Sequence, residues 1–509
     1  MNKATDSKKL YKTIIIIGIA LLFNVLVYYM SRDKKYVEEA ILGSIVLFSF
    51  YQFMHLALKK WRYVGYVLVV IGCLIIALNQ TLGLITRFIY GSEFTYGHAL
   101  SILNSNWNEI MSMLSTMTLG VFVFIINILF QFQVVRVSGI IIKKESYNWA
   151  VAFLWLIIPT IALSMRSASA DKPFSIFLRN TFAYNFRPVM QAYTQYEEEQ
   201  VIMGTPVDYS NLVVSDSSAH IVVLVIGESA RRQNMSLYGY ERETTPHQDA
   251  EKSNMLLYNN MVSSAGITLF SVPMLLTKVA PEDYTQSKHL LGDNIIQLAN
   301  TLGYETYWLS TQEEGNVYVS TVTNMSKFAS HTHFYKGYDT VLLDPLKKVL
   351  ASKTKKKFII LHINGSHSNA CGKYPATESY FTDGKPFIDC YDNSIRYTDR
   401  LMQSIFELLR ESNAAVVYLS DHAEKLSDER FVHSDSKEGA EIPYYIWYAN
   451  KFPSRLKNVR TVDELSSLEI NYYEIAKLFG VQNLVFNDKK KIKFLKSDLS
   501  VVDYEALIP

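Results

Sequence analysis

The sequence predicts two fold classes in one chain: an α-helical membrane domain with five transmembrane helices, then an α/β domain whose central, mainly parallel sheet is flanked by helices. Long apolar segments are confined to the first third of the 509 residues. After residue 218, short β-branched apolar segments alternate with segments of helical periodicity, which is typical of a parallel sheet covered on both faces. We expect a membrane domain at 1–165, a linker with amphipathic helices at 166–218 and the α/β domain at 219–509.

The membrane domain is predicted from five apolar segments before residue 166. Each is about 17–25 residues long and nearly free of charge, as a membrane-spanning helix requires. A signal peptide would explain only the first segment, and the alternative is a set of buried helices in a large soluble core. The five segments are Tyr11–Met30, Ala40–Leu58, Tyr63–Ile85, Ser115–Val135 and Trp149–Met165.

Lysine and arginine in the short connections indicate the orientation of these spans. They are frequent in the N-terminal head, at 59–62 and at 136–144, whereas the connection at 86–114 holds only Arg87. The connection at 32–39 is also basic, against the trend, although acidic residues accompany its basic ones. With the head inside and an odd number of spans, everything after Met165 lies outside, in the periplasm or on the outer face of a cell with one membrane.

Cysteine usage agrees with an exported α/β domain. Cys371 and Cys390 are both in that domain and could close a disulfide in an oxidising compartment, with two buried thiols as the alternative. Cys73 lies within the third span. The formal net charge of +2 gives no case for a nucleic-acid partner.

The elements of the α/β domain follow from composition and periodicity. Helical patterns at 294–303 and 391–412 separate apolar segments that are short enough for strands. The six predicted strands are 221–227, 254–262, 304–310, 357–363, 414–420 and 442–449.

Metal-ligand side chains follow several of these predicted strands. Glu228 comes directly after the first strand, and Asp421 and His422 come directly after the fifth. Ligands of such sheets bind beyond the carboxyl ends of the strands, so we expect these side chains to meet at one edge. Each residue alone has an ordinary structural explanation, such as a helix cap, and it is the joint placement that favours a metal site. The other candidates near strand ends are Thr268, His362, His367 and His433.

Two carboxylates and an imidazole suit Zn²⁺ with its fourth position open. A metal beside the Thr268 hydroxyl would lower its pKa and make it a nucleophile at neutral pH. The segment after Thr268 is apolar with helical spacing, so the start of a helix would favour an anion such as a phosphate ester beside the hydroxyl. His367 and His433 could bind a second metal, steady the transferred group or protonate the leaving alcohol.

Four motifs of the sequence resemble those of a known family: "VIGESARRQNMSLYGYERETTP" (225–246), "GITLFSVPMLL" (266–276), "HINGSH" (362–367) and "YLSDHAEKL" (418–426). They resemble the phosphoethanolamine transferases that modify bacterial lipid A, lipooligosaccharide core or related surface glycans, within the alkaline phosphatase/sulfatase superfamily. The resemblance covers essentially the whole chain, and the motifs follow the family's order.

The resemblance implies roles for the candidate residues. Glu228, Thr268, Asp421 and His422 match the family's zinc site, with Thr268 as the phosphoethanolamine acceptor. His367 and His433 match the family's outer histidines for substrate or a second zinc, and His362 is a further substrate-binding candidate. The segment "ILNSNWNEI" (102–110) resembles a periplasmic loop that holds the lipid head group, which adds Asn104, Asn106 and Glu109, with ordinary polar loop residues as the alternative.

The resemblance also implies the setting of the reaction. We expect a bacterial inner-membrane, multi-pass monomer with a periplasmic catalytic domain, one tightly bound Zn²⁺ and the option of a second, transient ion. The donor is then phosphatidylethanolamine, and the acceptor is a lipid A phosphate or a core sugar of lipopolysaccharide or lipooligosaccharide.

The sequence departs from lipid A-modifying members around the acceptor pocket. Ala265 and Met274 stand where those members have a cysteine pair, and "WLSTQEEGNVY" (308–318) lacks their substrate-binding lysine. Ser368 and Asn369 replace a frequent Gly-Pro. The zinc chemistry is unaffected, but the identity of the acceptor stays open.

Three other functions are alternatives to this one. A phosphoglycerol transferase like the lipoteichoic acid synthases would share the five spans and the threonine, but "YGYERETTP" (238–246) favours phosphoethanolamine transfer. A sulfatase would need a formylglycine made from Cys or Ser, which Thr268 cannot become. A non-catalytic envelope scaffold with an inherited fold is the third.

Overall fold

The computed structural model describes two compact units. One comprises residues 1–99 and 109–192, and the other comprises 100–108 and 193–509. The described residues, apart from a few isolated positions, are 37–90, 93–104, 114–141, 207–215, 217–285, 291–312, 321–367, 369–427, 430–454, 456–487 and 491–508.

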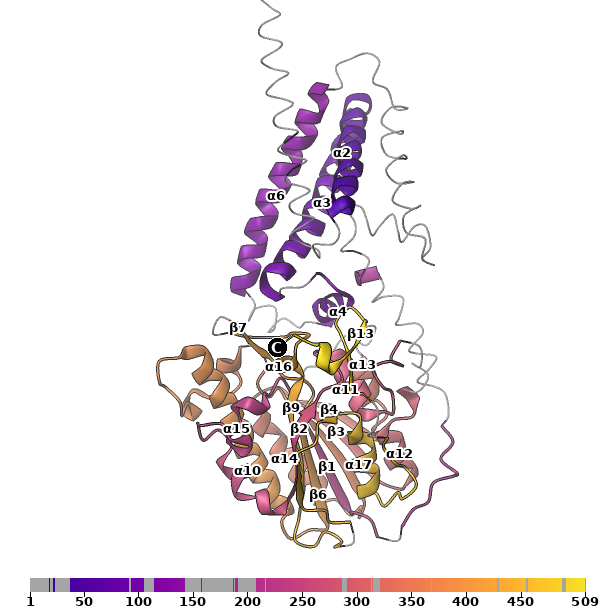
Figure 1. Cartoon of the computed structure of the whole chain (residues 1–509), viewed down its shortest axis with the longest axis vertical. Coiled ribbons are helices and arrows are strands. Elements are labelled where there is room, and N and C mark those ends of the chain that lie inside the picture. The colour runs from indigo at the N-terminus through magenta and orange to yellow at the C-terminus, as the bar shows by residue number, and fades with distance from the viewer. Residues whose placement is uncertain are drawn as a thin grey trace, which may run out of the picture. The chain divides into compact units, whose positions relative to one another are not determined.

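Three long helices form most of the described part of the first unit (Figure 1): α2 (Val37–Lys60), α3 (Arg62–Tyr90) and α6 (Leu114–Ile141). They pack through an apolar cluster that includes Tyr51 from α2, Cys73 from α3 and Val134 from α6. A buried polar contact also links them, because Gln131 donates from Nε2 to Oε1 of Gln80, 2.9 Å away. Polar contacts of this kind join helices where no water is available.

Two helices among the described residues, Arg62–Phe88 and Thr118–Arg136, are long and apolar enough to cross a membrane. Both leave large apolar side chains exposed, for example Val67 and Phe122 at 56% and 61%. They correspond to the predicted third and fourth spans, and α2 lies over the second. The first and fifth predicted spans lie outside the described residues apart from single positions, so the five-span arrangement stays a prediction.

The second unit is an α/β domain built on a central sheet of nine strands among the described residues. The strand order is β10-β2-β9-β6-β1-β5-β3-β4, and β11 pairs with β2. Pairing is parallel except along β9, which runs antiparallel to both β2 and β6. The strands are β1 (Ile221–Gly227), β2 (Met255–Val262), β3 (Glu305–Ser310), β4 (His331–Phe334), β5 (Lys357–His362), β6 (Ala414–Ser420), β9 (Glu441–Tyr448), β10 (Arg460–Val462) and β11 (Ser466–Ser467).

Helices cover both faces of this sheet, as Figure 1 shows. On one face, Val222, Leu224 and Ile226 of β1 share a core with α11, α12, α13 and α17. On the other face, Val223 and Val225 share a core with α14 and α15. Because β1 is buried on both faces, it is apolar at every position before Gly227. The helices are α10 (Pro246–Ala250), α11 (Thr268–Leu276), α12 (Ile295–Thr301), α13 (Thr321–Ser326), α14 (Leu343–Leu350), α15 (Pro386–Leu409), α16 (Lys437–Ala440) and α17 (Ile470–Leu478).

The six predicted strands and two predicted helices are confirmed, with boundary differences of a few residues. The largest difference is at α15, which begins at Pro386 rather than at 391 because proline fits the first turn of a helix. The predicted strand at 442–449 is β9, the antiparallel one. Most of the predicted linker at 166–218 lies outside the described residues.

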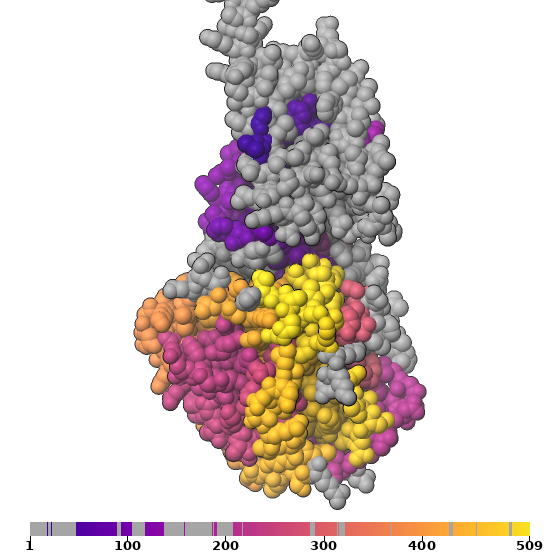
Figure 2. Space-filling view, viewed as in Figure 1, coloured from indigo at the N-terminus to yellow at the C-terminus, as the bar shows by residue number. Residues whose placement is uncertain are grey.

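The C-terminal segment lies on the surface of this unit, where Figure 2 shows it in yellow. It forms the antiparallel pair β12 (Lys493–Leu495) and β13 (Val501–Asp503). The amide of Leu495 donates to the carbonyl of Ser264, 2.8 Å away, in the loop that leads to α11. Phe494 is fully buried in a small core with Val262 at the end of β2. The C-terminal segment therefore holds the loop between β2 and α11 in place. Two further short strands, β7 (Lys425–Ser427) and β8 (Arg430–Val432), form a hairpin after β6.

Candidate metal and nucleophile site

Two neighbouring strand ends and one helix start bring four predicted site residues together. β1 and β6 are parallel neighbours with Gly227 opposite Ser420, so Glu228 and Asp421 leave the same edge of the sheet side by side. The loop after β2 places Thr268 at the first position of α11. Glu228, Asp421 and His422 are almost fully buried, whereas Thr268 is half-buried.

The separations between these groups match a shared metal ion. Nε2 of His422 lies 3.2 Å from Oε1 of Glu228 and 3.6 Å from Oδ2 of Asp421. The Thr268 hydroxyl donates to Oε2 of Glu228 at 2.9 Å and lies 3.2 Å from Nε2 of His422. Ligands about 2.1 Å from a tetrahedral ion lie about 3.4 Å from one another. The four side chains therefore have the donor types and the spacing of a zinc site.

The tautomer of His422 is set by its other ring nitrogen. Nδ1 lies 3.0 Å from the carbonyl oxygen of Ala423, which can only accept, so Nδ1 carries the proton. In the neutral ring Nε2 then holds the lone pair, and it faces Glu228 and Asp421. A histidine that ligates a metal is oriented in this way by a hydrogen bond from its second nitrogen.

A buried carboxylate oxygen supports the metal assignment. Oδ2 of Asp421 has no hydrogen-bond donor among the described residues, although the side chain is fully buried. A buried polar atom without a partner is costly in free energy, and a cation would supply the missing partner.

The protonation equilibria reflect two carboxylates crowded into one buried site. Burial disfavours the charged form of His422, but the carboxylates of Asp421 and Glu228 outweigh it and raise its pKa to about 10. Burial and the charge of Glu228 raise the pKa of Asp421 to about 7. Burial also works against ionisation of Glu228, yet the charge and hydrogen bond of His422 hold its pKa well below the usual range. Without a metal, His422 therefore carries a proton, and its positive charge balances part of the negative charge of the two carboxylates. A bound cation would take over this role.

Ser229 adopts a left-handed backbone conformation next to Glu228, with φ of 59°. This conformation is uncommon for residues other than glycine and recurs at functional sites. It lets the Ser229 hydroxyl donate to Oε1 of Glu228 at 2.7 Å, and its carbonyl accepts from the Tyr391 hydroxyl at 2.6 Å. The hydrogen bond from Ser229 therefore orients the carboxylate of Glu228.

The two outer histidines lie beside the first group. His367 and His433 form a second set with Glu228 whose ligand atoms are within 4.8 Å of one another. Their ring centroids are 5.6 Å apart, and His433 is 4.7 Å from the His422 ring. Burial lowers the pKa of His367 to about 4, so its ring is neutral at neutral pH. A neutral ring offers a lone pair to a metal or an N–H to an oxygen.

His362 belongs to neither set of possible ligands. It is fully within β5, only 2% exposed, and packs edge-on against Trp308 with ring centroids 5.4 Å apart. Asn104 is the last residue of α4 (Tyr96–Asn104), and its side chain is not described. Asn106 and Glu109 lie outside the described residues. Substrate binding by these four residues stays a prediction.

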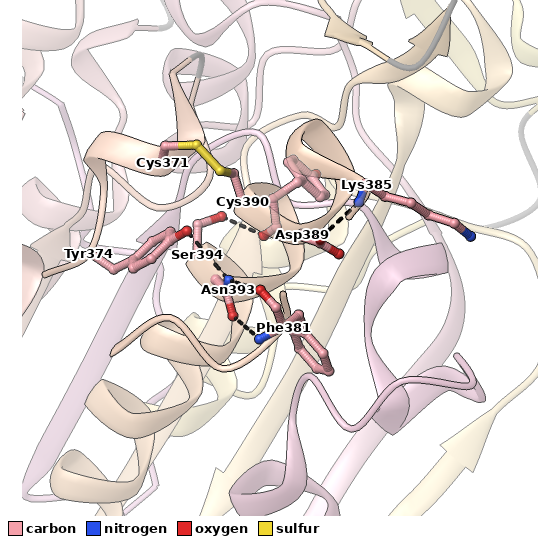
Figure 3. Close-up of a disulfide and its surroundings, with 9 residues drawn as sticks. Cys371, Tyr374, Phe381, Lys385, Asp389, Cys390, Asn393 and Ser394 are labelled. Carbon is pink, nitrogen blue, oxygen red and sulfur yellow. Dashed lines mark hydrogen bonds between the residues drawn. A yellow bond between two sulfur atoms is a disulfide. The ribbon is translucent and has the colours of Figure 1, made fainter. Parts of the chain in front are cut away.

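Cys371 and Cys390 form a disulfide, with Cα atoms 4.6 Å apart (Figure 3). The bond joins the segment after His367 to the start of α15. In the same region the side-chain oxygen of Asn393 accepts from the amides of Tyr380 and Phe381 at 2.9 and 2.8 Å. The disulfide and these hydrogen bonds restrain the backbone of the long connection between β5 and α15.

Gln312 is a site residue that the sequence reasoning missed. Its Nε2 donates to Oε2 of Glu228 at 2.9 Å and to the carbonyl of Ile363 at 3.0 Å. It follows β3 by two residues, so the rule that polar residues at strand ends converge would have found it. Amide side chains are common in loops, which is why Gln312 carries a weaker signal than a carboxylate or an imidazole.

Comparison with known proteins gives the family. A family model described as Sulfatase matches residues 220–481. A putative transferase, YhbX, from Escherichia coli (strain K12) is 31% identical over 428 residues, covering 80% of this chain and 78% of the relative. Phosphoethanolamine transferase EptC from the same organism is 26% identical and covers 72% of this chain and 71% of EptC.

Solved structures of relatives share the fold of this chain. The C-terminal periplasmic domain of EptC from Escherichia coli superposes with a TM-score of 0.53 at 25% identity, covering 60% of this chain and 98% of that domain. The integral membrane protein lipooligosaccharide phosphoethanolamine transferase A (EptA) from Neisseria meningitidis has a TM-score of 0.59 at 18% identity and covers 99% of this chain and 98% of EptA, which shows a common fold. The chain therefore belongs to the sulfatase family, and its relatives there include phosphoethanolamine transferases.

Proposed function

We propose that the chain is a membrane-anchored, zinc-dependent transferase that moves phosphoethanolamine from phosphatidylethanolamine to a surface glycan. Transfer proceeds through a covalent phosphoethanolamine ester on Thr268. The observation that carries the proposal is the position of the Thr268 hydroxyl, 2.9 Å from Glu228 and 3.2 Å from His422 at the start of α11. Relatives named as phosphoethanolamine transferases support the type of reaction.

Zinc is the ion that the donor set favours. Glu228, Asp421, His422 and Thr268 would hold it, and its charge would lower the pKa of the Thr268 hydroxyl and stabilise charge on the phosphoryl oxygens. The solved EptC domain of Escherichia coli includes a complex with Zn, which supports the choice.

In the first half-reaction the Thr268 oxygen attacks the phosphorus of phosphatidylethanolamine. Its proton passes towards Oε2 of Glu228, to which the hydroxyl already donates. The bond from phosphorus to the diacylglycerol oxygen breaks, and the protonated form of His433 gives a proton to that oxygen, while the neutral ring of His367 donates an N–H hydrogen bond to the transferred group. The start of α11 favours the anionic group beside Thr268, because the first amides of a helix have no partner within the helix.

In the second half-reaction an acceptor oxygen attacks the same phosphorus and the Thr268 oxygen leaves. His433 then takes the acceptor's proton, and Thr268 recovers its own from Glu228. The acceptor is a lipid A phosphate or a core-sugar hydroxyl. Relatives named as Kdo(2)-lipid A and lipooligosaccharide phosphoethanolamine transferases support an acceptor of this class.

The membrane anchor is consistent with a bilayer lipid as donor. We propose a membrane domain at 1–165, a linker at 166–218 and a periplasmic catalytic domain at 219–509 of a bacterial inner-membrane protein. Two observations support this arrangement: the two apolar helices, and the likeness of the second unit to the periplasmic domain of EptC.

Intact mass spectrometry tests the proposal. The purified chain is incubated with phosphatidylethanolamine beside a Thr268→Ala variant and a metal-stripped sample. We expect a gain of about 123 Da, one phosphoethanolamine, only in the metal-loaded wild-type chain. A glycerol-phosphate adduct from phosphatidylglycerol would instead show that the chain is a phosphoglycerol transferase. If neither lipid gave an adduct, the non-catalytic scaffold would be the favoured function.

A further inference from the structure

The loop after β3 contacts the predicted metal ligand Glu228 through one side chain. Both N–H groups of the Gln312 amide find acceptors: Oε2 of Glu228 at 2.9 Å and the carbonyl of Ile363 at 3.0 Å. Ile363 directly follows β5, the neighbour of β1 in the sheet. Gln312 therefore ties the carboxylate of Glu228 to the backbone at the end of the next strand.

Hydrogen bonds also fix the backbone next to Gln312. The side-chain amide of Asn364 donates to the carbonyl of Thr311 at 2.9 Å. The buried carboxylate of Asp339 accepts from the amides of Asn364 and Gly365 at 2.9 and 3.0 Å and also from the Thr311 hydroxyl. The loops after β3 and β5 thus form one hydrogen-bonded unit, and Gln312 is the side chain that connects this unit to Glu228.

Gln312 and Thr268 share the same acceptor. Both donate to Oε2 of Glu228 at 2.9 Å. A buried carboxylate oxygen left without any donor is destabilised, so these two hydrogen bonds stabilise the position of Oε2. Gln312 is the donor of the two that also bonds to the backbone, through the carbonyl of Ile363.

We propose that Gln312 is a positioning residue for the metal site: it holds Oε2 of Glu228 so that the carboxylate keeps the orientation in which it would bind the metal. This inference rests on the proposed zinc-dependent function. An outer hydrogen bond of this kind is worth about 10–100-fold in metal affinity or activity.

The test measures zinc affinity and metal-free stability separately. Gln312→Met keeps the side-chain length and removes the donor, and Gln312→Ala is the second variant. Gln233→Met is the matched control, because Gln233 also donates to a carboxylate, that of Glu441, which belongs to neither set of possible metal ligands. Each full-length chain in detergent is titrated with zinc against a chromophoric chelator, and its thermal unfolding is followed with the metal removed.

We expect zinc to bind about 10–100-fold more weakly to both Gln312 variants than to the wild type or the Gln233 control, with the metal-free transition temperature unchanged. Wild-type zinc affinity in both Gln312 variants would overturn the inference and leave the proposed function intact, even if their metal-free stability fell. Failure of the wild-type chain itself to bind zinc would instead overturn the proposed function, and this inference with it.

Discussion

Gly365 packs directly against the backbone of Glu228. A β-carbon at position 365 would lie 2.8 Å from the carbonyl oxygen of Glu228 and 2.9 Å from its amide nitrogen. The backbone at Gly365 is also left-handed, with φ of 51°, and the next amide, of Ser366, donates to the Glu228 carbonyl at 2.9 Å. The turn after β5 therefore fixes the backbone of the predicted metal ligand at the end of β1, and only glycine fits there.

The first prediction is that Gly365→Ala disturbs the metal site. The new methyl group cannot fit without moving Glu228, so we expect zinc affinity to fall by about tenfold or more. The left-handed backbone adds a strain of about 1–2 kcal/mol. The matched control is Gly384→Ala, since Gly384 has φ of 82° but nothing within 4 Å of its β-carbon position. Equal zinc affinity in the two variants would contradict the prediction.

The second prediction concerns zinc and thermal stability. Because the site places buried carboxylates together, zinc should bind the folded chain and raise its free energy of unfolding, by about 2.7 kcal/mol when free zinc is 100 times the dissociation constant. Scanning calorimetry with zinc and with chelator measures the difference. In Asp421→Asn the gain should be largely lost, because a charged ligand is removed. A gain of the same size in that variant would place zinc elsewhere.

The third prediction concerns the disulfide between Cys371 and Cys390. It closes a connection with a sequence separation of 19, so its loss should lower the free energy of unfolding by about 3 kcal/mol. Denaturant unfolding of Cys371→Ser/Cys390→Ser, with and without reductant, measures the loss. Reductant should lower the stability of the wild type to that of the double variant and leave the double variant unchanged. A wild type insensitive to reductant under unfolding conditions would argue against a stabilising role.

The fourth prediction concerns Arg242, from the "YGYERETTP" motif. Its guanidinium pairs with Asp392 at 2.8 Å and Asp389 at 2.9 Å, and both carboxylates are nearly fully buried. Arg242→Met leaves these charges without their cation, which should cost about 3 kcal/mol or more in the free energy of unfolding.

The control for Arg242 is Arg400→Met. Arg400 pairs with Glu378 on the surface, with 54% of its side chain exposed, so its loss should cost at most about 1 kcal/mol. Urea unfolding of the two variants measures both changes. Equal losses would show that burial of Asp392 does not determine the effect.

Most elements of the α/β domain could be predicted from the amino-acid sequence alone. β1 and β6 are apolar at nearly every position, and β5 is apolar between Lys357 and His362, because both faces of the sheet are covered. Such apolar segments are easily distinguished from the amphipathic helices between them. The sequence also groups Glu228, Asp421 and His422, because parallel strands end at one edge of a sheet and polar residues placed there lie close together.

The tertiary structure alone decided which strands are neighbours and which side chains support the ligands. β9 looks like the other strands in sequence, yet it is the antiparallel one. Ser229 and Gln312 lie in loops and Asp339 begins a short 3-10 helix, η7 (Asp339–Leu342), so none of them is part of a periodic pattern. Their hydrogen bonds depend on how separate strand ends are arranged in space. A local sequence pattern reports burial and periodicity, whereas the partner of a loop side chain is set by contacts between residues far apart in the chain.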